Sequence, residues 1–359
     1  MDNQSPRPAR GEARYHGLDL LRAVAMLLGL VIHAPLIYFF TDIQTDFGFE
    51  QVTPIEFWMM PIGGWIHQWR MPCFFLLAGF FALLVLERRG PGHFARDRFV
   101  RIGLALMIFF IPYDLLDGRL DGTLMHLWFL YYLLPMCLAA ALLWRLGAPM
   151  QVFAWPARRV WTWPVYLLVL LPLSRAGLGP GQFVLVPLEF GDFDLGPFAY
   201  YAMWFAMGAA LYHHRAVLEG LSRLWVILPG MVVGLVTMVL HWDGVPGLGA
   251  VSSLCWVLAI VGLAHRGLKR RSAMVDWLIE LSYPIYLLHL FPAIFVGIGL
   301  LALGVPQILA IPLTVVLGFG ISAVGYYALI KYAPLNWVVN GYKNAWFKWP
   351  GRAHRAQRG

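Results

Sequence analysis

LDLLRAVAMLLGLVIHAPLIYFF, residues 18–40, decides the fold because it is apolar over a length that matches a lipid bilayer. A helix needs about 20 consecutive apolar residues to cross the hydrocarbon core of a membrane. Three ionisable residues, Asp19, Arg22 and His33, interrupt this run. The stretch therefore predicts a transmembrane helix that carries polar side chains into the bilayer.

Similar apolar runs recur along the whole chain. Hydrophobic residues make up 60% of the sequence and charged residues 13%, whereas soluble domains carry about 25% charged residues. An apolar outer surface is stable in lipid. The sequence thus predicts an all-α, polytopic integral membrane helical bundle with about ten transmembrane helices. The candidate spans are residues 18–40, 68–86, 99–116, 124–144, 160–173, 197–212, 224–240, 247–264, 279–301 and 307–330.

Charge alternates between the connecting segments and predicts the orientation. Six segments together hold 23 Lys and Arg against six acids, and the intervening loops hold three Arg against eleven acids. Basic loops face the cytoplasm, so we expect both termini to be cytoplasmic. The net charge of +8 is explained in this way without a nucleic-acid partner. The basic segments are residues 1–17, 87–101, 145–160, 213–223, 265–277 and 331–359.

The short loops indicate one membrane domain, residues 18–330, between a cytoplasmic N-terminal tail, 1–17, and a basic cytoplasmic C-terminal tail, 331–359. No phosphate-binding GxxxxGK[ST] loop, HExxH zinc motif, metal-ligand spacing or GxSxG elbow occurs in the sequence. We therefore expect neither ATP-driven transport within this chain nor a bound metal. Nothing in the sequence indicates a homo-oligomer.

Arg22 and His33 are eleven residues apart, close to three helical turns, so they lie on one face of the first span. Ionisable groups inside a membrane are costly and are functional candidates. A neutral imidazole there can act as a general base or as a nucleophile. The structural alternative is a histidine whose hydrogen bonds are satisfied by a neighbouring helix.

Arg98 and Arg101 open the third span within a basic cluster that includes Arg88, Arg89 and Arg96. Residues three apart are neighbours on a helix surface, and paired guanidinium groups suit phosphate. A topology signal that touches anionic lipid headgroups explains the same spacing.

Further polar residues form three groups, two at the starts of spans and one on a helix face within a span. One-turn spacing relates the members of the first and third groups. The cation in the first group suits an anionic or polyhydroxylated acceptor, and an ion pair with an outer-loop acid explains it equally well. The other two groups would form a site if they surrounded one cavity, but such residues more often make interhelical hydrogen bonds. These candidates are His67 with Arg70, His126 with Trp128, and Ser282 with Tyr286 and His289.

Several of these motifs together resemble the membrane acyltransferase 3 family. Arg22-x10-His33 and Arg98-x-x-Arg101 match its signatures, and the resemblance extends in order through RMPCFFLLAGFF at 70–81, HLWFL at 126–130 and SYPIYLLH at 282–289. The chain is most similar to a branch that succinylates osmoregulated periplasmic glucans. The matching region covers most of the chain.

The resemblance implies an acyl-CoA-dependent O-acyltransferase of the bacterial inner membrane. It would move a succinyl or acetyl group from cytoplasmic succinyl-CoA or acetyl-CoA to a hydroxyl of a periplasmic or cell-envelope glycan. Carried over by motif, His33 is the catalytic histidine and Arg22 supports it or the donor. Arg98 and Arg101 bind the CoA phosphates, and no cofactor is permanently bound. The partners expected are the donor, the glycan acceptor and the lipid bilayer.

Two other functions fit the same residues. A transporter or flippase for a glycan or a lipid-linked precursor also needs intramembrane charges, but it has no use for CoA. A non-catalytic scaffold for glycan synthesis leaves Arg22 and His33 unexplained. The residues alone leave open which acyl group moves, and whether His33 attacks the thioester or deprotonates the acceptor.

Overall fold

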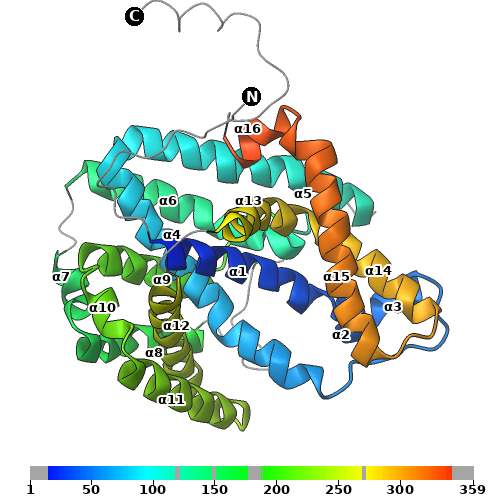
Figure 1. The fold of residues 1–359 in the computed structure, drawn as a ribbon, viewed down its shortest axis with the longest axis horizontal. Helices are drawn as coiled ribbons and strands as arrows, with labels where there is room; N and C mark the ends of the chain where they lie inside the picture. The colour runs from blue at the N-terminus through cyan, green and yellow to red at the C-terminus, as the bar shows by residue number, and fades with distance from the viewer. Residues whose placement is uncertain are drawn as a thin grey trace, which may run out of the picture.

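The computed structural model describes residues 15–117, 122–147, 151–176, 187, 189–268 and 272–341, which form helices joined by short connections (Figure 1). No β-strand occurs in these ranges, where an isolated bridge pairs Thr123 with Glu189. The predicted all-α class is confirmed. Most of the two terminal tails lies outside the described residues.

Some helices, such as α9 and α12, begin and end close to the predicted spans, whereas α4 extends well beyond the predicted span 68–86 and α1 ends seven residues before residue 40. The longer α-helices are α1 (His16–His33), α4 (Met59–Arg98), α5 (Ala105–Asp117), α6 (Trp128–Arg145), α8 (Leu167–Ala176), α9 (Leu195–His213), α11 (Leu224–Trp242), α12 (Leu248–Gly267), α13 (Ala273–Leu288), α14 (Leu290–Ala302) and α15 (Gln307–Gly325). The short ones are α2 (Leu36–Phe39), α3 (Asp42–Asp46), α7 (Gln151–Ala154), α10 (Val217–Leu221) and α16 (Leu335–Val339). Three segments are 3₁₀-helical, η2 (Met125–Leu127), η3 (Trp155–Arg158) and η4 (Val160–Tyr166), and two are π-helical, η1 (Phe99–Leu104) and η6 (Tyr326–Lys331).

Six helical segments of the described chain are long and apolar enough to cross a membrane, or up to seven when the bent pair α13 and α14 counts as one span. The longest, Met59–Leu115, has 57 residues, far more than the roughly 20 that a crossing needs. Gly90 interrupts it with φ 75° and ψ 167°, a conformation that only glycine adopts easily. This fold defines a multi-pass membrane protein.

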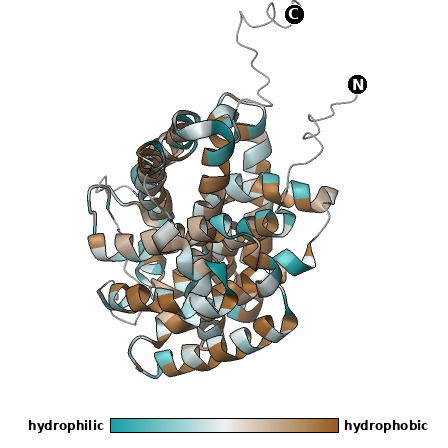
Figure 2. Cartoon of the chain, turned by 90° about the vertical axis from the view of Figure 1, so that its left-hand side faces the viewer, coloured by the Kyte–Doolittle hydropathy of each residue, from teal (hydrophilic) through white to brown (hydrophobic). Residues whose placement is uncertain are grey.

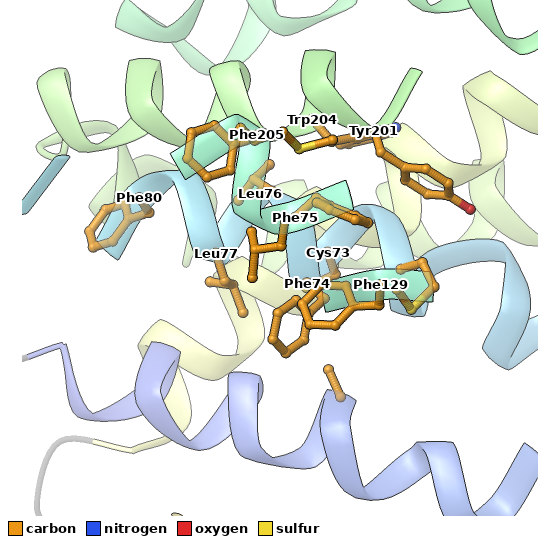
Figure 3. Close-up of a cluster of buried hydrophobic side chains, with 14 of the residues drawn as sticks. Cys73, Phe74, Phe75, Leu76, Leu77, Phe80, Phe129, Tyr201, Trp204 and Phe205 are labelled. Carbon is orange, nitrogen blue, oxygen red and sulfur yellow. The ribbon is translucent and has the colours of Figure 1, made fainter. Parts of the chain in front are cut away.

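The core forms around α1 and α4. Helix α1 lies near the centre of the bundle and packs against α4, α12, α13 and α14 (Figure 1). Aromatic side chains of α4, α6 and α9 interlock beside it, and Phe75 stacks on Tyr201 with ring centroids 4.7 Å apart (Figure 3). Such packing holds α4 and α9 in a fixed relation, on which the site depends.

Helices on the outside expose apolar side chains. Leu228, Val232 and Val236 of α11 and Val316 and Val324 of α15 are all more than half exposed. Figure 2 shows hydrophobic residues along helices on the surface of the molecule as well as inside it. Lipid chains cover such faces without penalty, since they are as apolar as the side chains.

One end of the bundle, here called the basic end, gathers the basic segments. Tyr15 interacts electrostatically with Arg215, Arg88 and Glu87. The pKa of its phenol is raised, chiefly because the group is partly buried. At the same end, His265 in the last turn of α12 contacts Glu219 of α10 at 3.1 Å. Segments that are far apart in the sequence therefore meet here.

The other end, here called the acidic end, joins the intervening loops. Gln307 at the start of α15 accepts a hydrogen bond from the backbone of Glu56 at 3.0 Å. The side chain of Gln68 donates to the carbonyl of Gly249 at 2.6 Å, and Tyr132 donates to the carbonyl of Asp194 at 3.0 Å. These contacts tie α15 to the segment before α4, α4 to the start of α12, and α6 to the start of α9.

Candidate active site

Three imidazole rings meet inside the bundle. His33 ends α1, His126 lies in η2 before α6, and His289 lies between α13 and α14. The ring centroids are 5.2 Å apart for His33 and His289, 6.1 Å for His33 and His126, and 5.0 Å for His126 and His289. The structure therefore brings three of the predicted site residues together from distant segments.

Breaks in regular helix place these rings. Pro35, which has no backbone N–H, follows α1 within one turn of His33. Met125 has φ 47°, a left-handed conformation unusual for a residue with a side chain, and it turns the chain just before His126. His289 occupies the point where α13 and α14 bend by 72°. Each histidine is thus presented by an irregular segment.

Hydrogen bonds to the backbone define the tautomer of His289. Its Nδ1 lies 2.8 Å from the carbonyl of Tyr286 and 3.1 Å from that of Ile285, so Nδ1 carries the proton and donates it. Nε2 then holds a lone pair, and it is buried without a hydrogen-bond partner among the described residues. Tyr286 donates to the carbonyl of His126 at 2.5 Å and ties α13 to η2.

Arg70 of α4 extends into the gap beside these rings. Its side chain is buried, and its Nη2 contacts the sulfur of Met71 at 3.4 Å. A Cβ atom added at Gly29 of α1 would lie 3.1 Å from Nη1 of Arg70 and 3.6 Å from Nε2 of His289. The absence of a side chain at Gly29 therefore leaves the space that the guanidinium group occupies.

A cavity of about 340 Å³ opens toward the acidic end, beside Gly247 and Gly249. A second, smaller hollow of about 20 Å³ lies nearer the start of α1, beside Ala25 and Met26. Four residues line both spaces: His33, Arg70, Met71 and Trp128. His33 and Arg70 thus stand where the two spaces meet.

The larger cavity has a polar and aromatic lining. Trp128 and Tyr201 form one wall, with ring centroids 5.4 Å apart, and His67 lies near them. Sequence reasoning missed several lining residues: Gln68, Ser174, Tyr200, Tyr201, His241 and Ser253. A histidine directly after an apolar span was a usable signal for His241, whereas the tyrosines are indistinguishable from ordinary aromatic residues at the membrane surface.

Two predicted residues lie away from the histidines. Arg22 is about 16 Å along α1 from His33 at 1.5 Å per residue, where it approaches Asp19 at 3.6 Å and lies over the ring of Phe81. Ser282 donates a hydrogen bond to the carbonyl of Ile279 in its own helix at 2.9 Å. Neither side chain lines the two spaces described above.

Arg98 and Arg101 lie where α4 passes into the π-helical η1. Arg98 approaches Asp97 at 3.7 Å, and Arg101 donates to the carbonyl of Val339 in α16 at 3.4 Å. Tyr283 of α13 donates to the carbonyl of Arg101 at 2.6 Å. Single π-helical turns occur often at functional sites. The arginine pair is therefore tied directly to the helix that ends at His289.

No group of three or more His, Cys, Asp or Glu in the described part of the chain is placed to hold a metal ion. Cys73 and Cys137 are free and buried, and Cys255 is free and partly buried.

The comparisons with known proteins agree with this architecture. The family model described as an acyltransferase domain matches residues 15–327, and the chain belongs to this family, the membrane acyltransferase 3 family. Within it, the chain is similar to the glucans biosynthesis protein C of Salmonella typhi, of Salmonella typhimurium and of Salmonella gallinarum. Each is 23% identical over 336 residues, which cover 79% of this chain and 83% of the relative. The predicted resemblance is confirmed. No solved structure matches the chain.

Proposed function

We propose that this protein is an O-acyltransferase of the bacterial inner membrane. It transfers a succinyl or acetyl group from cytoplasmic acyl-CoA to a hydroxyl of a periplasmic or cell-envelope glycan, with osmoregulated periplasmic glucan as the acceptor. The observation that carries this proposal is the position of His33, which lines both the 340 Å³ cavity and the small hollow nearer the start of α1. Two substrates that arrive from opposite ends of the bundle meet at this ring.

His33 supplies the reactive lone pair. As a general base it takes the proton of the acceptor hydroxyl while the hydroxyl oxygen attacks the thioester carbon. As a nucleophile it is acylated first and then passes the group to the acceptor. In both routes the thiol of CoA leaves toward the side from which it came.

The donor binds from the basic end, where Arg98 and Arg101 hold the CoA phosphates. Helix α13 supports this arrangement because Tyr283 bonds to the backbone of Arg101, and His289 follows six residues later, about 9 Å along the helix. Arg22 lies about 16 Å along α1 from His33, toward the start of the helix. Replacement of both Arg98 and Arg101 by alanine should abolish acyl-CoA binding, whereas a transporter would be indifferent to CoA.

The proposal includes ten spans, both termini in the cytoplasm, and a single membrane domain over residues 18–330. Ten spans follow if Met59–Leu115 counts as two helices joined at Gly90, and if α8, α9 and the α13–α14 pair each cross the bilayer. The basic end then faces the cytoplasm. Alkaline phosphatase fused after Gly48 or Gly191 should be active, and after Gly90 or Gly267 inactive. The reverse pattern would contradict this orientation.

The decisive experiment is His33→Ala. The variant should insert in the membrane and keep its thermal stability in detergent, yet its transfer rate should fall by about 10²- to 10⁴-fold, the usual contribution of a general base. The periplasmic glucan from cells that carry only the variant should lack the mass of the acyl group in mass spectrometry. His213→Ala, an exposed histidine at the basic end, is the matched control. Wild-type transfer by His33→Ala would refute the role of His33.

A further inference from the structure

Arg70 is a buried cation whose charge no carboxylate of the described residues balances. The residue is 8% exposed, its Nε has no hydrogen-bond partner among the described residues, and the hydrogen-bond acceptor of its Nη2 is a thioether sulfur, that of Met71 at 3.4 Å. Taking a guanidinium group out of water without a counter-ion is costly, and such groups are rarely kept without a use. The surroundings of Arg70 therefore point to an anion that the substrate brings.

None of the side chains that face the guanidinium group is acidic. Helix α1 contributes Gly29 and His33, and α4 contributes His67 and Met71. Tyr201 of α9 and Tyr286 of α13 bring phenols. The remaining neighbours are His126, Trp128 and His289. All of them are apolar or offer neutral dipoles, so the positive charge persists at this position.

The guanidinium group is also directed at the reacting centre. Nη1 lies beside Gly29, where an added Cβ would be 3.1 Å from it, and Gly29 is one helical turn before His33 on α1. Arg70 and His33 line the same two spaces. A thioester placed against His33 therefore lies next to Arg70.

We propose that Arg70 is a catalytic residue that stabilises the oxyanion of the acyl transfer. The inference rests on the function proposed above and adds to it the group that meets the developing negative charge. Fixed donors aimed at such a charge in a water-poor site are the largest single source of catalysis in many enzymes. A buried guanidinium group without a counter-ion is such a fixed donor.

The bonds change as follows along the general-base route. The acceptor hydroxyl gives its proton to His33, its oxygen bonds to the thioester carbon, and the carbonyl π electrons move onto the carbonyl oxygen. Arg70 donates hydrogen bonds to that oxyanion. The carbonyl then re-forms, the carbon–sulfur bond breaks, and the leaving thiolate takes the proton from His33. An ester and free CoA thiol result.

A second anion to consider is the distal carboxylate of a dicarboxylic acyl group. The small hollow beside Arg70 has about 20 Å³, close to the space of one water molecule. The hollow is too small for a four-carbon arm, but the 340 Å³ cavity, which Arg70 also lines, has room for one. The position of Arg70 beside His33 points to the oxyanion, and the experiment separates the two roles.

The test compares Arg70→Gln and Arg70→Lys with wild type in detergent or liposomes. Arg145→Gln, an exposed arginine at the end of α6, controls for loss of charge. The donors are acetyl-CoA, succinyl-CoA and butyryl-CoA, which has the length of succinyl without the carboxylate. Arg70→Gln should lower kcat by about 10²- to 10³-fold with every donor that wild type uses, while donor binding without acceptor changes less than threefold. Added guanidinium ion should restore part of the rate, and Arg70→Lys should retain more activity than Arg70→Gln.

Other results would overturn the proposal in distinct ways. A loss confined to succinyl-CoA, or a raised donor KM with kcat unchanged, assigns Arg70 to the acyl carboxylate. A raised acceptor KM with kcat unchanged assigns it to acceptor binding. A kcat within threefold of wild type removes Arg70 from catalysis. If wild type itself transfers no acyl group, it is the proposed function that fails, and the two failures are therefore distinguishable.

Discussion

The imidazole of His289 lies against that of His33, with ring centroids 5.2 Å apart and ring planes inclined by 50°. His289 is itself fixed, because its Nδ1 donates to backbone carbonyls one turn earlier in α13. No backbone hydrogen bond of this kind holds His33 among the described residues, where its Nδ1 is buried without a partner. The orientation of the His33 ring is therefore set by packing against a neighbour that the backbone holds in place.

This relationship predicts that His289 positions His33. His289→Ala removes the ring, leaves a space beside His33 and should lower kcat by about tenfold to a hundredfold, or about 1.4–2.8 kcal/mol in the barrier. His289→Phe keeps the bulk of the ring but loses its hydrogen bonds, so the kcat of this variant should lie between those of wild type and His289→Ala. The acceptor KM and membrane insertion should change little. Equal rates for His289→Ala and wild type would show that His33 needs no such support.

Gly29 provides a second test of the same geometry. Gly29→Ala places a Cβ 3.1 Å from Nη1 of Arg70, closer than ordinary contact, so the guanidinium group must shift by a few tenths of an ångström. We expect kcat to fall by about tenfold, because small displacements in an active site are costly. Stability should stay within about 1 kcal/mol, since alanine favours a helix over glycine.

The matched control for Gly29→Ala is Gly320→Ala. Gly320 lies in α15, and a Cβ there meets no atom within 4 Å. Its kinetics should match wild type. If both variants lose the same activity, the effect of Gly29→Ala is on helix flexibility and not on Arg70.

Hydropathy predicted where helices form because, in lipid, the backbone polar groups of each span must form hydrogen bonds within that span. It did not predict that the run at residues 279–301 bends by 72° at His289. Pro292 removes the N–H that would bond to the carbonyl of Leu288, which weakens the helix at that point. A proline three residues after a histidine was visible in the sequence, but the size and direction of the bend depend on the packing of α14 against α15.

The candidate site was predictable in part. Motif positions singled out His33, Arg70, His126 and His289, but spacing alone gave no way to bring four separate spans to one point. The role of Arg70 depends on what surrounds it, namely a set of neighbours without a carboxylate. Such an absence is a property of packing and not of local sequence.

The aromatic wall of the larger cavity predicts an acceptor effect. Sugar rings pack on aromatic faces, and Tyr201 lies beside Trp128 with its hydroxyl end directed away from the Phe75 cluster (Figure 3). Tyr201→Ala should raise the acceptor KM by about tenfold, the worth of one good aromatic contact, with donor KM unchanged. Tyr201→Phe should stay near wild type. A change confined to donor KM would place the glycan elsewhere.

The contact between α4 and α9 predicts where the fold tolerates an added side chain least. A Cβ at Gly208 of α9 would collide with the carbonyl of Leu76, and one at Gly79 of α4 with the carbonyl of Phe205. Backbone cannot move aside as a flexible side chain does, so Gly208→Ala must push the two helices apart. We expect a loss of about 1–3 kcal/mol or more of stability, read as a lower midpoint of thermal unfolding in detergent and a lower yield of folded protein.

Because the aromatic residues that stack across this contact include Tyr201, which also lines the larger cavity, the folded fraction of Gly208→Ala should show a raised acceptor KM. Gly299→Ala in α14 is the control, since an added Cβ there meets nothing within 4 Å, and it should leave both the unfolding midpoint and the KM unchanged. Gly79→Ala combined with Gly208→Ala should cost less than the sum of the two single variants, because one separation of the helices relieves both collisions. Strict additivity would indicate that the two glycines act at independent contacts and that α4 and α9 do not move as rigid bodies.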